Sequence, residues 1–142
     1  QAVGHSMVLR QGNTSVSKRG VVRGIHFAEL PPGQAKYVTC ARGAVLDFAI
    51  DVRVGSPTFG QWDTVLLDDV DRKAIYLGEG LGHAFVALTD DATVSYLVTD
   101  TYDPTREHAV NPLDEQIALL FPPEAGEPLL SPKDLEAPSL AE

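Results

Sequence analysis

The stretch Ala44–Arg53 (AVLDFAIDVR) decides the fold class of this chain. Apolar side chains occupy every second position from Leu46 to Val52, and the positions between them include two aspartates. A repeat of two residues is the side-chain period of a β strand, whose successive side chains point to opposite faces. We therefore predict a strand here, with one apolar face and one face that carries charge.

The chain from about Val21 to Pro122 continues this pattern in short segments separated by turns. Val94, Tyr96 and Val98 share one face of a second predicted strand. Clusters of Gly, Pro and Asp stand between the segments at intervals of roughly 8–12 residues, which predicts an all-β sandwich or barrel. Further strand candidates are Ala35–Ala41, Trp62–Leu67, Ala74–Leu77 and His83–Leu88.

Chain length and the C-terminal composition set the expected domain organisation. The 142 residues suffice for one domain, and no internal repeat divides them, so we predict a single domain over residues 1–142. After Pro122 the chain is rich in Pro and Glu. We expect an arm or a short terminal helix there, around Pro132–Glu136.

The composition excludes several classes of partner. The chain has 11 Lys and Arg against 20 Asp and Glu, a formal net charge of −9, and its cations are not clustered as nucleic-acid binding requires. The apolar runs are too short to cross a membrane, and no secretion signal opens the chain, so we expect a cytoplasmic protein. The single cysteine, Cys40, leaves no internal disulfide and no multi-cysteine zinc site, and its place in a predicted strand favours a buried hydrophobe.

Four features carry candidate chemistry, although each one alone has an ordinary structural explanation. His26 and Arg23 alternate on a predicted strand, so they point to opposite faces unless a bulge intervenes. The Gly-rich segment Gly78–His83 allows close backbone approach but lacks the ending of a phosphate-binding P-loop, so a plain hairpin loop is the simpler interpretation. Tyr96 and Lys36 lie in strands, where a core tyrosine and a solvent-facing lysine are the commoner cases.

The spacing of the four histidines does not predict a metal site. The chain has no His-x-His pair, no His-Glu-x-x-His motif and no cysteine pair. A barrel can still bring His26 and His83 together in space, so spacing alone leaves a metal site open.

The same residues belong to a longer series of motifs. The most specific run is Gly55–Trp62 (GSPTFGQW), which follows Asp47–Arg53. The other motifs are Gln11–Ser17, Arg23–Phe27 (RGIHF), Pro32–Val38, Gly80–Phe85 (GLGHAF), Tyr96–Tyr102 and Leu130–Asp134 (LSPKD). In this order they resemble the dTDP-4-dehydrorhamnose 3,5-epimerase family, and more the branch that serves secondary-metabolite deoxysugars than the cell-wall rhamnose enzymes.

The resemblance implies a cupin-type jelly-roll β barrel that is usually a homodimer and uses no metal or organic cofactor. His26 matches the family's general base, Asp134 the partner of that base, and Tyr96 the general acid. Arg23 and Lys36 match residues around the sugar and its 4-keto group. The positions that match substrate-contacting residues are Gln11, Asn13, Arg23, Lys36, His83 and Tyr102.

The implied activity is epimerisation of a dTDP-4-keto-6-deoxyhexose, a small nucleotide sugar, at C3, C5 or both. A single-carbon epimerase and a non-catalytic nucleotide-sugar-binding cupin remain alternatives. This sequence also departs from the family pattern. The family's N-terminal segment, which reaches into the neighbouring subunit's site, has no counterpart here, Pro112 replaces a Trp, and Thr39 stands where Arg is common.

Overall fold

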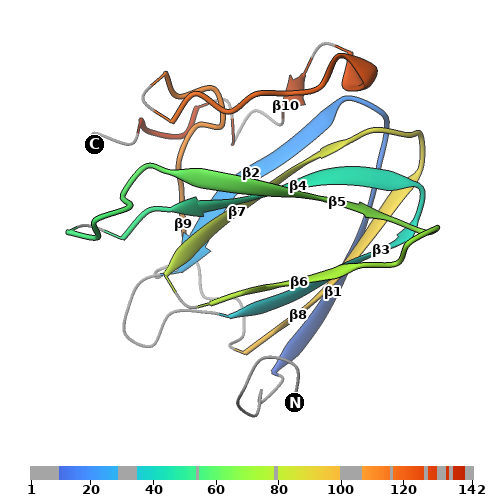
Figure 1. Ribbon diagram of the computed structural model, residues 1–142, viewed down its shortest axis with the longest axis horizontal. Helices are drawn as coiled ribbons and strands as arrows, with labels where there is room; N and C mark the ends of the chain where they lie inside the picture. Colours follow the sequence, from blue (N-terminus) through green and yellow to red (C-terminus); the bar gives the residue numbers. More distant parts are fainter. Residues whose placement is uncertain are drawn as a thin grey trace.

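Two β sheets face each other, and the C-terminal segment lies across the outer side of one of them (Figure 1). The computed structural model describes residues 10–28, 35–53, 55–78, 80–99, 107–115, 117–126, 128–130, 134 and 136–139. The four-stranded sheet has the order β1 (Gln11–Ser17), β8 (Ala92–Val98), β3 (Lys36–Arg42) and β6 (Ala74–Leu77). The six-stranded sheet has the order β10 (Leu129–Leu130), β2 (Val21–Ala28), β7 (Leu81–Ala87), β4 (Ala44–Asp51) and β5 (Trp62–Asp68), and β9 (Glu107–Ala109) pairs with β2.

The all-β prediction is confirmed, and every predicted strand corresponds to an observed one. Ala44–Arg53 forms β4 but ends at Asp51, and Ala74–Leu77 forms β6 over the predicted range. Strand β1 begins at Gln11, upstream of the region in which strands were predicted. Among the described residues the helical positions are the 3₁₀ turn at Pro123–Ala125 and the single residue Asp134.

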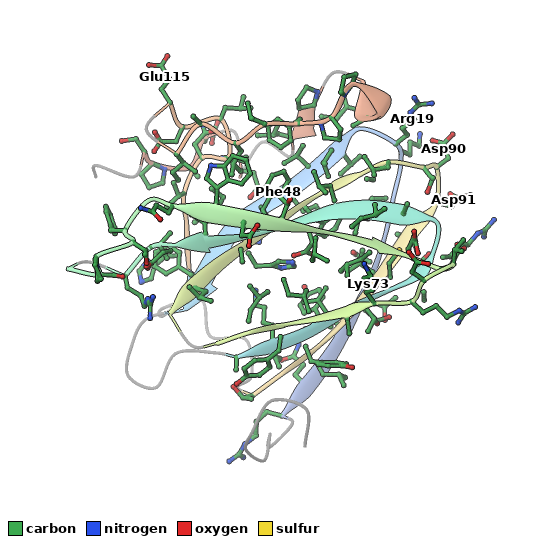
Figure 2. The ribbon with its side chains drawn as sticks, viewed as in Figure 1. Arg19, Phe48, Lys73, Asp90, Asp91 and Glu115 are labelled. Atoms are coloured by element: carbon green, nitrogen blue, oxygen red, sulfur yellow. The ribbon has the colours of Figure 1, made fainter. Side chains whose placement is uncertain are left out.

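The two faces of β4 serve two different cores. Phe48 is fully buried and faces the C-terminal segment (Figure 2), and the fully buried Ile50 belongs to the same cluster. Asp47 and Asp51 lie on the other face, which looks toward the four-stranded sheet, and they are only 0% and 5% exposed. The predicted charged face therefore lines the interior of the sandwich instead of meeting solvent.

The outer core joins the six-stranded sheet to the C-terminal segment. Phe48 and Ile50 pack there in one cluster with Val110 and Ile117. The Trp62 indole N–H donates a 2.9 Å hydrogen bond to the carbonyl of Ile117. Strand β10 adds parallel to β2 at the sheet edge. This segment is the predicted arm, and the expected helix at Pro132–Glu136 lies mostly outside the described residues.

The inner core fills part of the space between the sheets. It contains Val38, Val45, Phe85 and Val94, which come from strands of both sheets. Cys40 belongs to the same cluster and is 4% exposed, and burial raises the pKa of its thiol. Its predicted role as a buried hydrophobe is confirmed. In the part of the chain that the structure describes, no helix is long and apolar enough to span a membrane.

Gly24 allows β2 to approach β7 closely, so a larger residue there should destabilise the fold. A Cβ atom at Gly24 would lie 2.6 Å from the carbonyl oxygen of His83 and 2.6 Å from Cβ of Ala84, and the φ of +127° disfavours any L side chain. We expect Gly24→Ala to lower the free energy of unfolding by at least about 2 kcal/mol, because backbone atoms must move. Chemical denaturation measures this loss.

Gly78→Ala is the matched control. A Cβ atom there meets nothing within 4 Å among the described residues, so we expect a change within about 0.5 kcal/mol. Equal stability of the two variants would contradict the assignment of Gly24 as a close-approach position.

Candidate active site

A cavity of about 230 Å³ opens between the two sheets beside the inner core. The six-stranded sheet and the C-terminal segment supply one wall, and β1, β3 and β8 supply the other. Most of its lining side chains are polar or ionisable, in contrast to the apolar core next to it. The lining residues are Ser15, Arg23, His26, Lys36, His83, Phe85, Tyr96 and Asp134.

A bulge in β2 places Arg23 and His26 on the same wall. Arg23 pairs with Phe85 and His26 pairs with His83, so three steps along β2 match two steps along β7. One extra residue reverses the alternation of side chains, because successive residues of a regular strand point to opposite faces. The bulge that a shared wall requires is present, and it turns both side chains into the cavity.

His26 and Asp134 form a hydrogen-bonded pair across 108 residues of sequence. His26 Nε2 lies 2.8 Å from Asp134 Oδ1, and the backbone N–H of Gly24 donates to Asp134 Oδ2 at 3.3 Å. The His26 side chain is 40% exposed, whereas that of Asp134 is 5% exposed. The carboxylate is therefore fixed in the protein while the imidazole remains open to the cavity. This contact confirms the predicted proximity of the two side chains.

The opposite wall presents Tyr96 and Lys36. Lys36 is 8% exposed, and its Nζ lies 5.6 Å from the centre of the Tyr96 ring. Tyr96 also contacts His83 from the other sheet, with ring centres 6.4 Å apart in an edge-to-face arrangement. Lys36, for which a solvent-facing position was the commoner expectation from sequence, is instead one of the buried polar residues.

The remaining predicted substrate residues differ in their relation to the cavity. Gln11 and Asn13 share the inner face of β1 with the cavity-lining Ser15, and Gln11 Nε2 donates to Asn13 Oδ1 at 2.9 Å. The two side chains lie on this face but are not part of the cavity lining. Tyr102 lies outside the described residues.

Four further residues of the site were given no role in the sequence analysis. Ser15 and Phe85 line the cavity, and Ser17 accepts a 2.9 Å hydrogen bond from Arg23 Nε. Asp47 Oδ2 lies 2.8 Å from Nε2 of His83. The two serines continue the every-second-residue spacing of Gln11 and Asn13, which was the available signal for them.

Asp51 forms a separate network at the end of β4. Arg53 donates to both of its carboxylate oxygens, and the hydroxyls of Ser56 and Thr58 also donate to it. Arg53 above all, and then the two hydroxyls, hold the pKa of Asp51 well below its ordinary range. These contacts fix the loop that leads toward β5.

Each histidine of the cavity is paired with a different aspartate. His26 and His83 are neighbours in register, but each is hydrogen-bonded to its own aspartate. Among the described residues, no group of three or more His, Cys, Asp or Glu side chains is arranged to hold a metal ion.

The two-sheet architecture and this interior site define a cupin-type β sandwich. The family model for dTDP-4-dehydrorhamnose 3,5-epimerase matches residues 1–142. This chain belongs to that family.

Relatives with named activities match nearly the whole chain. The dTDP-4-dehydrorhamnose 3,5-epimerase of Mycolicibacterium smegmatis is 63% identical over 139 residues, which cover 98% of this chain and 68% of that protein. The dTDP-4-dehydrorhamnose 3-epimerase of Streptomyces niveus is 58% identical over 142 residues, 100% of this chain and 68% of that protein. The family members that resemble this chain thus include both double and single epimerases.

Solved structures agree with this fold over nearly all of the chain. NovW, a 4-keto-6-deoxy sugar epimerase from the novobiocin biosynthetic gene cluster of Streptomyces spheroides, gives a TM-score of 0.94 at 58% identity, covering 99% of this chain and 69% of that one. ChmJ, a 3′-monoepimerase from Streptomyces bikiniensis in complex with dTDP-quinovose, gives 0.93 at 54% identity, covering 99% and 70%.

Proposed function

We propose that this chain is an isomerase that epimerises a dTDP-4-keto-6-deoxyhexose at C3, C5 or both. The observation that carries the mechanism is the position of its two candidate proton-transfer groups on opposite walls of one cavity. His26 belongs to the six-stranded sheet, and Tyr96 belongs to the four-stranded sheet. A sugar ring held between the sheets has a base on one side and an acid on the other, which inversion at carbon requires.

His26 is the proposed general base. The C4 carbonyl acidifies the protons on C3 and C5, because the carbanion formed at either carbon is an enolate. Histidine suits this proton transfer because its ordinary pKa of about 6.5 lies near the working pH. Asp134 accepts from His26 Nε2 in the neutral ring, so His26 offers its other nitrogen to the substrate. The Gly24 amide holds the second carboxylate oxygen and so keeps the pair in place.

Lys36 and Tyr96 complete the proposed reaction. A cation held in a buried site stabilises the negative charge that develops on O4 better than one in water, and Lys36 is 8% exposed. Tyr96 then returns a proton to the other face of the carbanion, since a phenol stays protonated at neutral pH. Gln11, Asn13, Arg23, His83 and Tyr102 are proposed substrate contacts.

These groups do not determine whether the enzyme epimerises one carbon or both, because epimerisation at C3 and at C5 needs the same base and acid. The relatives are enzymes, which does not favour the non-catalytic alternative. We also propose that residues 1–142 form one domain and that the enzyme is cytoplasmic.

The activity itself is tested by solvent isotope exchange. We expect deuterium from D₂O to enter a dTDP-4-keto-6-deoxyhexose at the carbon that is epimerised, and NMR reads C3 and C5 separately. The same incorporation is expected after treatment with EDTA, because the proposed acid–base groups need no metal. Absence of exchange at both carbons in the folded protein would exclude the proposed reaction.

The Tyr96→Phe variant separates the two proton transfers. The ring is kept and only the acidic hydroxyl is lost, so proton abstraction by His26 should continue in part. We expect epimer formation to fall by about 10²-fold or more, the scale for loss of a general acid, while deuterium exchange falls less. Both rates are read in one NMR time course.

Tyr37→Phe is the control for this variant, because Tyr37 lies on the strand that carries Lys36 but on the opposite face, away from the cavity. It should epimerise at the wild-type rate. A Tyr96→Phe enzyme that also forms product at the wild-type rate would show that another group or water is the acid.

We also propose a homodimer in which the outer face of the four-stranded sheet is covered. Most residues of its strands that point away from the cavity are uncharged, Arg42 at the end of β3 being charged, although the chain has a net charge of −9. Val16, Tyr37 and Leu97 are 59%, 40% and 38% exposed on β1, β3 and β8. Light scattering should give the mass of two chains, and a monomer across working concentrations would contradict the proposal.

A further inference from the structure

Asp47 is the most deeply buried ionisable side chain beside the cavity. It is 0% exposed and lies on β4, between β7 and the edge strand β5. Its Oδ2 lies 2.8 Å from Nε2 of His83. Its Oδ1 is fully buried and has no hydrogen-bond partner among the described residues.

Stability does not explain a carboxylate at this position. A buried carboxylate needs partners for both oxygens, and one that lacks them destabilises the fold. The residues directly opposite Asp47 on the neighbouring strands are Phe85 and Val65, which offer no side-chain donor. An apolar side chain of similar volume would match these neighbours, but it would not replace the acceptor for His83 Nε2.

The orientation of the His83 ring explains the presence of a carboxylate at position 47. The His83 ring lines the cavity, its Nε2 points to Asp47, and its edge-to-face contact with Tyr96 places it beside the opposite wall. No hydrogen bond to Nδ1 is present in the described part of the chain. Since a carboxylate accepts only from a protonated nitrogen, the neutral ring carries its proton on Nε2 and leaves Nδ1 as an acceptor.

We propose that Asp47 is a positioning residue that acts through His83. It fixes the tautomer and the ring orientation in which the unprotonated Nδ1 faces the substrate and accepts a hydrogen bond from a sugar hydroxyl. The expected effect of Asp47 on turnover rests on the proposed epimerase function. The tautomer itself is independent of that function.

The tautomer is read directly by ¹⁵N NMR of the histidine side chains. The chain has four histidines, and a His83→Gln variant assigns the His83 signals by their loss. In the neutral ring at about pH 8 we expect protonated Nε2 and unprotonated Nδ1 in the wild type. Asp47→Leu should lose this preference. A wild-type ring protonated on Nδ1 would overturn the proposal whatever the enzyme's activity.

Measurements of kcat and of the melting temperature then distinguish a positioning role of Asp47 from a purely structural one. We expect Asp47→Leu to lower kcat of the folded enzyme by at least about tenfold, the scale for losing a group that orients a histidine, and also to lower the melting temperature, because the His83 N–H loses its acceptor. Asp47→Asn keeps a neutral acceptor for the Nε2 proton, so it should retain more activity than Asp47→Leu. If Asp47→Leu does not fold, Asp47→Asn decides by the same two measurements.

Asp51→Asn is the matched control. Asp51 is a buried carboxylate on the same strand and face, but its partners are in the loop after β4. We expect kcat within about twofold of wild type for Asp51→Asn. An Asp47 variant that folds and keeps wild-type kcat, or one that loses activity only in proportion to lost stability, would overturn the proposal. A wild-type protein with the expected His83 tautomer but no isotope exchange would refute the proposed epimerase function alone.

Discussion

The apolar contact between the six-stranded sheet and the C-terminal segment is the interaction on which the site depends. The interior of the sandwich contains Asp47, Lys36 and His83, so the space between the sheets cannot supply apolar burial throughout. The outer face of the sheet compensates, because Phe48, Ile50 and their neighbours are covered by residues far along the chain. The covering segment also carries Asp134 to His26. One contact therefore contributes to stability and brings the two members of the proposed catalytic pair together.

The two histidine–aspartate pairs of the cavity have the same contact distance but different surroundings. His26 is 40% exposed above its buried partner, as a group that exchanges protons with a bound molecule must be. His83 is 7% exposed, and its partner is completely buried. A ring enclosed in this way has little freedom to turn, and its hydrogen-bonding pattern is set before any ligand arrives. The site thus combines one exposed histidine, the proposed proton carrier, with one enclosed histidine.

The sequence predicted the strands well because their side-chain period is local. It did not predict which face of β4 is interior, since the alternation of Leu46 to Val52 with polar residues is the same for a solvated sheet. Strand β1 was not predicted as a strand because QGNTSVS has few apolar residues, and its stability comes from pairing with β8. His26, Tyr96 and Asp134 were assigned from motif order. Their distances depend on tertiary contacts that no local pattern contains.

The bulge in β2 shows that part of the site is encoded in the length of a segment. Arg23 and His26 share a wall only because β2 has one residue more than the β7 segment opposite it. A deletion of one residue between them would restore regular strand pairing and keep both side chains on this wall, because residues two apart in a strand share a face. A register slip that absorbed the bulge while keeping every residue would instead turn one of the two out of the cavity, because residues three apart in a regular strand face opposite ways. The site is therefore sensitive to how β2 is aligned with β7, and not only to which residues the two strands contain.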